Sequence, residues 1–194
     1  MEFFEGVRLF IGNALLSRKR GRINRKVTFS NFGHVKNIGI VWDASKAEEF
    51  SLLTKFHQQM HDRNIDVKII GFFPGINLPD QYTAIRYLKC LKKNELNLLY
   101  RPVSSDAESF IARNFDVLID VNFKKLFPLR YISCLSAAGL KVGLRDGETH
   151  NTPFDIMMDL EKPVNIENYL NQILFYLEMI NSDSSKKHTK KNLK

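Results

Sequence analysis

An uninterrupted apolar run that ends in polar residues, Phe115-Asp-Val-Leu-Ile-Asp-Val-Asn122, limits the folds open to this chain more than any other stretch. Consecutive Val, Leu and Ile residues are typical of a parallel strand that is covered by helices on both faces. Open parallel sheets bind their ligands at the carboxyl ends of such strands. The run therefore predicts a central strand over 115–121, with Asp120 and Asn122 at the ligand-binding edge of the sheet.

Other strands and helices alternate around this central strand. Strand patterns occur at residues 38–43, 66–73, 87–91, 140–144 and 154–159. Helical patterns cover 45–64, 105–112, 128–139 and 166–180, and the first two begin with capping boxes, Ser45-Lys-Ala-Glu48 and Ser105-Asp-Ala-Glu108. Residues 81–100 fit either a helix or a strand; we favour the strand at 87–91, a turn at 92–94 and an extended segment at 96–100. The alternation predicts an α/β, Rossmann-like domain with a mostly parallel sheet and an N-terminal helical extension.

The positive charge of the chain is concentrated at its two ends. The chain has 29 basic and 21 acidic residues, which gives a net charge of +8. Residues 1–26 and 182–194 together contain 12 of the basic and 3 of the acidic residues, so residues 27–181 have a net charge of −1. A nucleic-acid-binding domain carries its basic stripe on a folded surface, so the neutral body argues against that function. We expect a helix with a basic linker (1–26), one Rossmann-like domain (27–181) and a disordered basic tail (182–194).

Residues 3–17 are predicted to form an amphipathic helix. Its apolar positions at helical spacing are Phe3, Val7, Phe10 and Ala14, with Phe4, Ile11 and Leu15 beside them. In one interpretation this face packs on the body or on a second subunit of a homodimer, and the basic run at 17–26 is a solvated linker. In the other, the helix and the basic run together bind an anionic membrane surface. Binding of nucleic acid by the basic run is a further alternative.

Cysteine content and hydropathy bear on the compartment. Cys90 and Cys134 form no CxxC pair, which favours two free thiols in a reducing cytoplasm. No apolar run approaches the ~20 residues that span a bilayer. The acidic residues Glu2 and Glu5 precede the basic cluster, the reverse of a secretory signal. We therefore expect a cytoplasmic protein, with peripheral association at the inner membrane as the alternative.

Three carboxylates are predicted to follow strands: Asp43, Asp120 and Asp146. At the carboxyl edge of a parallel sheet they would lie together, where such groups bind Mg²⁺ or act as acid and base. In the interpretation that we favour, Asp43 instead caps a helix and the other two begin polar loops. The longest polar loop at this edge, 146–151, adds Glu148 and His150 to the candidate ligand-binding residues, which also include Asn122.

Motifs for cofactors and metals are absent from the sequence or incomplete. His57 and His61 stand one helical turn apart, a spacing that binds Zn²⁺, but position 58 is Gln instead of the catalytic Glu and no third ligand follows. The first strand is followed by no GxGxxG, and the chain has no GxxxxGK[ST] and no GxSxG. Cys134 falls within a predicted helix and is interpreted as structural. We predict neither a cofactor nor a metal.

The chain resembles a family of uncharacterised bacterial proteins of the Bacteroidetes type, whose domain has no assigned function. The resemblance rests on the stretches Asn37-Ile-Gly-Ile-Val-Trp-Asp43, Phe115–Asp120, Ile132-Ser-Cys-Leu-Ser-Ala-Ala-Gly-Leu-Lys-Val-Gly143 and Phe154-Asp-Ile-Met-Met-Asp159. Residues 116–143 are also similar, more loosely, to the N-terminal Rossmann-like domain of heptosyltransferase-like glycosyltransferases. The first resemblance implies an architecture, and the second implies a nucleotide-sugar or phosphorylated substrate.

The leading hypothesis is a non-catalytic cytoplasmic α/β domain that binds a partner or a small ligand, with the inner membrane surface as one such partner for residues 1–26. The alternative is a glycosyltransferase-like or nucleotide-sugar-binding protein that acts at the carboxyl edge of the sheet. Nucleic-acid association through the basic termini is the third hypothesis.

Overall fold

The computed structural model describes residues 2–29, 31–145, 152–161 and 163–189. The strands are β1 (Asn37–Asp43), β2 (Asp66–Phe73), β3 (Leu88–Lys92), β4 (Val117–Val121), β5 (Leu140–Leu144) and β6 (Ile156–Met158). The helices are α1 (Glu2–Arg20), α2 (Phe50–Asp62), α3 (Ser105–Ala112), α4 (Phe127–Leu135) and α5 (Ile166–Thr189). Short 3₁₀ helices occupy Phe32–His34, Ala47–Glu49, Asp80–Tyr82 and Lys93–Glu95. The α/β fold predicted from the sequence is confirmed.

The sheet of the described residues has six strands in the order β3-β2-β1-β4-β5-β6, and every neighbouring pair is parallel. This is the strand order of the doubly wound dinucleotide-binding fold. Strands β1 to β3 are added towards one edge of the sheet and β4 to β6 towards the other, so the strand order reverses between β1 and β4. The sheet is therefore wholly parallel, where the sequence predicted a mostly parallel one. The predicted central strand lies beside β1 as β4, and all five of its residues are buried.

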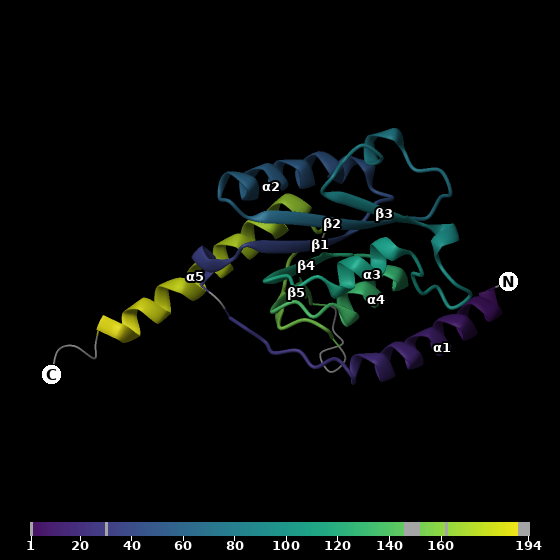
Figure 1. The fold of residues 1–194 in the computed structure, drawn as a ribbon, viewed down its shortest axis with the longest axis horizontal. Helices are drawn as coiled ribbons and strands as arrows, with labels where there is room; N and C mark the ends of the chain where they lie inside the picture. Colours follow the sequence, from purple (N-terminus) through teal and green to yellow (C-terminus); the bar gives the residue numbers. More distant parts are fainter. Residues whose placement is uncertain (1, 30, 146–151, 162, 190–194) are drawn as a thin grey trace.

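Helices cover both faces of the sheet, as Figure 1 shows. One face packs against α2 and α5, where Trp42, Leu53 and Tyr169 belong to the same buried cluster. The other face packs against α3 and α4, where Val41, Phe110 and Ile132 lie together. Successive side chains of a strand point to opposite faces, so Asp43 and Asp120 share the face of Val41 and Leu118.

Both predicted capping boxes are wrong in the residue that caps the helix. Ser45 does not cap α2, because its hydroxyl donates to Asp43 and a 3₁₀ turn precedes the helix. The cap of α3 is Ser104 and not Ser105, since the Ser104 hydroxyl accepts from the Ala107 amide. Ser104 and Ser105 are both of a residue type that caps helices, so the sequence pattern did not distinguish them; the path of the chain before α3 makes Ser104 the cap.

The segment 96–102 is a compact loop, so the extended segment predicted at 96–100 is wrong. The Asn97 side-chain carbonyl accepts hydrogen bonds from the amides of Leu99 and Arg101, at 2.9 and 3.0 Å. Tyr100 adopts a positive φ of 58°, which turns the chain back towards the Leu96–Pro102 bridge. Asn side chains stabilise turns in this way, whereas a strand needs a partner strand.

Helix α1 packs on the outside of α4. The side of α1 that makes this contact is not the apolar face that the sequence analysis identified. The side of α1 that faces the body is Leu9, Gly12 and Leu16, and Leu16 lies in a cluster with Phe127 and Tyr131. Gly12 permits the close approach, because a Cβ there would lie 3.0 Å from the Leu99 carbonyl and from the Phe127 ring. The apolar residues predicted to face inward lie on the other side of α1, as described below.

The basic run that follows is not a solvated linker throughout. The helix itself continues through Arg20, and the Arg20 guanidinium donates to the Thr152 carbonyl at 2.6 Å. Arg25 forms a two-pronged ion pair with Asp155, and it also donates to the Ala138 carbonyl at 3.2 Å. At the other end of the chain, α5 extends beyond the predicted end at 180 to Thr189, and residues 190–194 lie outside the described part.

Candidate functional site

The point between β1 and β4 is where a doubly wound sheet binds its ligand, and here the loop after β4 makes contacts on both sides of it. The loop 122–126 follows β4, and its Phe123 ring packs edge-on against Tyr169 of α5 with ring centroids 5.2 Å apart. On the other side, the Lys124 ammonium lies 3.4 Å from a carboxylate oxygen of Asp43 at the end of β1. The loop therefore links the ends of β1 and β4 to α5 at this point of the sheet.

Asp43, the first predicted site residue, is buried and held within the protein. One of its oxygens accepts from the amide and the hydroxyl of Ser45, at 3.1 and 2.6 Å. The other oxygen is buried without a hydrogen bond among the described residues, and the nearby Lys124 ammonium supplies charge at ion-pair distance. Asp43 thus fastens the turn after β1 and the loop after β4 to each other.

Asn122, the second predicted site residue, closes the same loop. Its side-chain carbonyl accepts from the Leu126 amide at 2.8 Å, and its side-chain amide donates to the Leu126 carbonyl at 3.0 Å. Both polar atoms of the side chain are therefore engaged by the backbone. The pair of bonds fixes the start of α4, which has no side-chain cap of its own.

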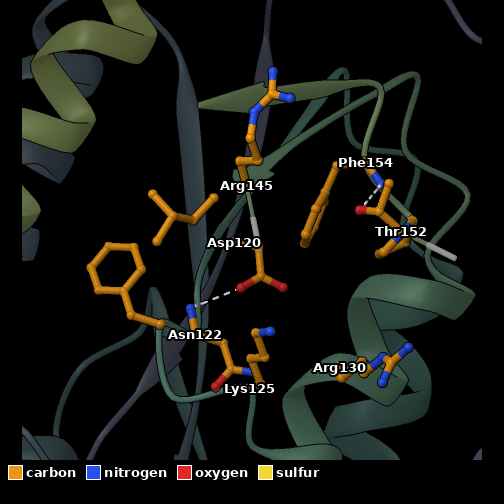
Figure 2. A pocket seen from close by; sticks show the side chains of 10 residues that line it. Asp120, Asn122, Lys125, Arg130, Arg145, Thr152 and Phe154 are labelled. Atoms are coloured by element: carbon orange, nitrogen blue, oxygen red, sulfur yellow. Dashed lines mark hydrogen bonds between the residues drawn. The ribbon is translucent and has the colours of Figure 1, made fainter. Parts of the chain in front are cut away.

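A cavity of about 240 Å³ opens one strand further along, above β4 and β5. Figure 2 shows Asp120 in its centre, with side chains from β4, α4 and the segment before β6 around it. Its described lining consists of Asp120, Asn122, Phe123, Lys125, Arg130, Leu144, Arg145, Thr152, Pro153 and Phe154. This set brings together Asp120 and Asn122 but not Asp43. Asp146, Glu148 and His150 lie outside the described residues.

Asp120 is the buried carboxyl group of this cavity. One oxygen accepts from the Asn122 amide at 2.8 Å, and the other accepts from the Ser133 hydroxyl on α4. Burial raises the pKa of Asp120 to about 6, while the hydrogen bonds from Ser133 and from the Asn122 amide act in the opposite direction. A carboxyl group with a pKa near neutrality can either accept or donate a proton to a bound ligand.

Three cationic side chains line the same cavity: Lys125, Arg130 and Arg145. Lys125 is placed by the tight loop before α4, where it adopts a positive φ of 55°. Arg130 projects from α4, with its guanidinium 3.5 Å from the side-chain carbonyl of Asn13 on α1. In Figure 2 the Arg145 side chain extends away from the Asp120 carboxyl group, and its Nε lies 3.6 Å from Asp159. The charge around Asp120 therefore favours an anion.

The remaining wall is an aromatic ring that depends on a glycine. A Cβ at Gly143 would lie 2.3 Å from the Phe154 ring, so only glycine allows this ring to lie over β5. Thr152 assists, because its hydroxyl accepts from the Phe154 amide at 3.3 Å. The cavity thus combines one apolar wall with convergent polar groups, the usual composition of a small-molecule site.

Lys141 is a buried ionisable group near this cavity. It is 3% exposed, and its ammonium donates to the carbonyls of Ser133 and Cys134 at 2.8 and 3.2 Å. These carbonyls belong to the last turn of α4, so Lys141 caps that helix. Burial, and then the positive charge of Arg25, lowers the pKa of Lys141 to about 8. Its role is structural and supports the helix that carries Ser133 and Arg130.

The histidine pair does not form a metal site with other described residues. The described part of the chain contains no cluster of three His, Cys, Asp or Glu residues that fits a metal ion. The His57 ring stacks on Tyr87 with centroids 3.7 Å apart, and burial lowers its pKa. Burial also raises the pKa of the Cys90 thiol to about 12, which keeps this cysteine unreactive.

Sequence reasoning missed Lys125, Arg130, Arg145, Thr152 and Phe154 as site residues. Lys125 and Arg130 carried a usable signal, since cations shortly after a predicted strand fall on the ligand edge of a parallel sheet. Phe154 was predicted only as the beginning of a strand, and no sequence signal marks its position over Gly143.

The comparisons with known proteins place the chain in a family. Residues 8–180 match the model of a family of unknown function, DUF6913, and the chain belongs to this family. A search of curated proteins finds no match. No helix among the described residues is long and apolar enough to cross a membrane.

Proposed function

We propose that this protein is a non-catalytic domain that binds a compact anionic ligand in the cavity above β4 and β5. The observation that carries the proposal is that Lys125, Arg130 and Arg145 all line the cavity that contains the buried Asp120. Cations attract a phosphate or carboxylate, and a carboxyl group between them recognises a hydroxyl or amine of the same ligand. We place this function in a bacterial cytoplasm, which the two free thiols support.

The size of the cavity limits the ligand. Sites for drug-sized molecules measure about 300–1,000 Å³, and this one measures about 240 Å³. The loop 122–126 is also tied to α5 and to Asp43 at the point where a doubly wound sheet binds a dinucleotide. Both observations favour a phosphorylated sugar or a phosphorylated hydroxy acid over a nucleotide sugar.

A thermal-shift and calorimetry panel tests the proposal. The panel contains inorganic phosphate, sugar phosphates, dicarboxylates, nucleotides and nucleotide sugars. A ligand at 100 times its Kd stabilises the folded state by about 2.7 kcal/mol, which is a measurable rise in Tm. Arg130→Gln should abolish the rise, whereas the matched Arg113→Gln, whose arginine pairs with Asp66, should keep it. A panel without any stabilising anion, or binding that persists in Arg130→Gln, contradicts the proposal.

The acidity of Asp120 gives a second readout. Below about pH 6 the carboxyl group becomes neutral, so it stops repelling an anion and gains a proton to donate. Anion affinity should therefore rise between pH 7.5 and 5.5, and Asp120→Asn should flatten the profile. Calorimetry with the best ligand of the panel measures both.

A second function is favoured by the same pKa. A carboxyl group that titrates near pH 6 is suited to general acid–base chemistry on a phosphorylated or nucleotide-sugar-like substrate, as the resemblance to glycosyltransferases implies. Turnover of any panel compound that is lost in Asp120→Asn with binding retained would replace the non-catalytic proposal. Nucleic-acid binding is a weaker alternative, because Arg20 and Arg25 of the basic run already bind the body.

A further inference from the structure

The outward face of α1 is an exposed apolar surface that the proposed function does not use. Phe4 and Phe10 are 70% and 75% exposed, and Val7, Ile11 and Leu15 are each 42–43% exposed. These residues share one side of the helix, opposite to Leu9, Gly12 and Leu16, which pack on the body. In Figure 1, α1 lies at the periphery of the molecule, outside α3 and α4. The helix is therefore held by one stripe and presents another to the outside.

A basic cavity of about 350 Å³ lies along the flank of this face. Its cations are Arg18, Lys19 and Arg22 from the end of α1, and Arg101 from the loop 96–102. Among the described residues, no carboxylate lies within ion-pair distance of Arg18, Arg22 or Arg101. The Lys19 ammonium contacts only a neutral group in the described part, the Tyr131 hydroxyl, at 3.1 Å. The cavity therefore has uncompensated positive charge.

The acidic residues of the helix do not oppose this charge. Glu5 stands four residues before Leu9, so it belongs to the side of α1 that faces the body. Arg8, three residues before Ile11, lies at a lateral margin of the apolar face, and Arg18, seven residues after Ile11, lies at its C-terminal end. Long basic side chains at such margins reach lipid headgroups while the apolar side chains enter the acyl region.

We propose that the outward face of α1 docks on an anionic lipid bilayer, with the lipid phosphate groups received by the basic cavity. Charge complementarity selects this occupant. A second copy of the chain would cover the apolar face but has the same net charge of +8, which opposes association. Nucleic acid would satisfy the cations but leave Phe4 and Phe10 in water. An anionic bilayer satisfies both, and the 19-residue helix would lie flat over about 28 Å of its surface.

Leu98 is a further exposed apolar residue in the loop that approaches α1. It is 76% exposed at the tip of the loop 96–102, next to Leu99, whose carbonyl contacts α1 at Gly12. Because α1 and this loop are already docked on the body, the surface is presented in one orientation. The ligand cavity above β4 and β5 is lined by other residues, so the two sites are tested separately.

Flotation of the full chain with vesicles tests the docking. Vesicles of phosphatidylcholine with phosphatidylglycerol should carry the protein at low salt, and vesicles of phosphatidylcholine alone should not. Phe4→Ser/Phe10→Ser should reduce binding at least about tenfold, because two large apolar side chains leave the bilayer. The matched control is Phe175→Ser/Tyr176→Ser, which removes two aromatic side chains that are 59% and 47% exposed on α5, and it should bind normally.

Charge variants test the basic cavity in the same assay. Each cation near an anionic membrane contributes about fivefold in affinity, so Arg18→Glu/Arg22→Glu should reduce binding more than tenfold. The control Lys36→Glu/Lys55→Glu changes the net charge by the same amount. Because Lys36 precedes β1 and Lys55 lies on α2, this variant should retain most of the binding. Equal losses in the two variants would reduce the effect to net charge and overturn the proposal.

Phe10→Trp reports insertion directly, against the background of the fully buried Trp42. Its emission should shift to the blue on addition of anionic vesicles, while Phe175→Trp should show no shift. Light scattering of the protein without vesicles measures its oligomeric state and so tests the competing explanation, a dimer formed through α1. The proposal fails if Phe10→Trp gives no shift at low salt, or if the chain is a dimer that Phe4→Ser/Phe10→Ser converts into a monomer.

Discussion

Helices α1 and α5 carry the same sequence signal and use it in opposite ways. Both have apolar residues at helical spacing. For α5 the sequence predicted a buried face, and for α1 it left open packing on the body, on a second subunit or on a membrane. In α5 the stripe is buried, since Tyr169 and Ile173 are 0% and 1% exposed against the sheet. In α1 the corresponding stripe faces away from the body, as Phe10 shows with 75% exposure. Periodicity identifies an apolar face but does not identify what covers it.

The difference comes from what each helix finds to pack against. After β6 the chain returns across the sheet face that α2 covers in part, and α5 packs on the same face. Two ion pairs, Lys55–Glu167 and Arg63–Glu178, join the two helices at 2.7 and 2.6 Å. The opposite face of the sheet is already covered by α3 and α4, so α1 can pack only on the outside of α4, through a narrow stripe centred on Gly12.

The largest expected effect is the loss of Tyr169. Its ring is fully buried against Phe123, and its hydroxyl donates to the Asp120 carbonyl at 3.0 Å. Tyr169→Ala should reduce the free energy of unfolding by about 3–5 kcal/mol, the usual cost of deleting a buried aromatic ring. Urea denaturation measures the change, and Tyr169→Phe, which loses only the hydroxyl, should cost about 1 kcal/mol. A small effect of Tyr169→Ala would show that α5 is as peripheral as α1.

The docked stripe of α1 should contribute less. Leu16 is 3% exposed and packs against Phe127 and Tyr131. Leu16→Ala should cost about 2 kcal/mol, the low end for a buried leucine, because α1 contacts one helix and one loop. Hydrogen exchange should show faster exchange in α1 with α5 unchanged. Equal acceleration in both helices would mean that they unfold as one cooperative unit.

The buried carboxyl group of Asp120, which accepts a hydrogen bond from Ser133 of α4, should make stability depend on pH. The folded-state pKa of Asp120 is raised from 3.8 to about 6, so the folded protein binds more protons than the unfolded chain between these values. Stability should therefore fall as pH rises from about 4 to 6. Asp120→Asn removes this dependence, a difference of about 1 kcal/mol between pH 5 and pH 7.

Urea denaturation of both proteins at the two pH values isolates the Asp120 contribution from that of the other carboxyl groups. The control is Asp62→Asn, at an exposed carboxylate at the end of α2, which should keep the wild-type slope. An unchanged slope in Asp120→Asn would show that Asp120 is ionised across this range.

The smallest expected effect is on the outward face of α1. Phe10→Ser should change the free energy of unfolding by less than about 0.5 kcal/mol, because the side chain makes little contact with the body. The same urea measurements give this value beside that of Leu16→Ala. A loss above 2 kcal/mol would mean that the face is covered in solution by another part of the protein or by a second copy.

The candidate site shows a similar division between local signal and tertiary arrangement. Asp43 and Asp120 follow apolar strands in the same way, and the sequence predicted that they lie together. They do share a sheet face, but Asp43 pairs with Lys124 of the loop 122–126 and does not line the cavity. Arg130, Phe154 and Arg145 come from three segments, and no spacing in the chain relates them. Their convergence follows from the strand order and from the close packing that Gly143 allows.

The sequence by itself determined the strands, the class of the fold and the polar ends of β1 and β4. These features depend on local patterns, since an unbroken apolar run must be buried on both sides. The tertiary structure decided which polar ends share a cavity and which apolar face of a helix meets the core. Burial is a competition among all segments for a limited surface, and its outcome depends on packing between residues far apart in the chain. For this reason the same pattern became core in α5 and an exposed face in α1.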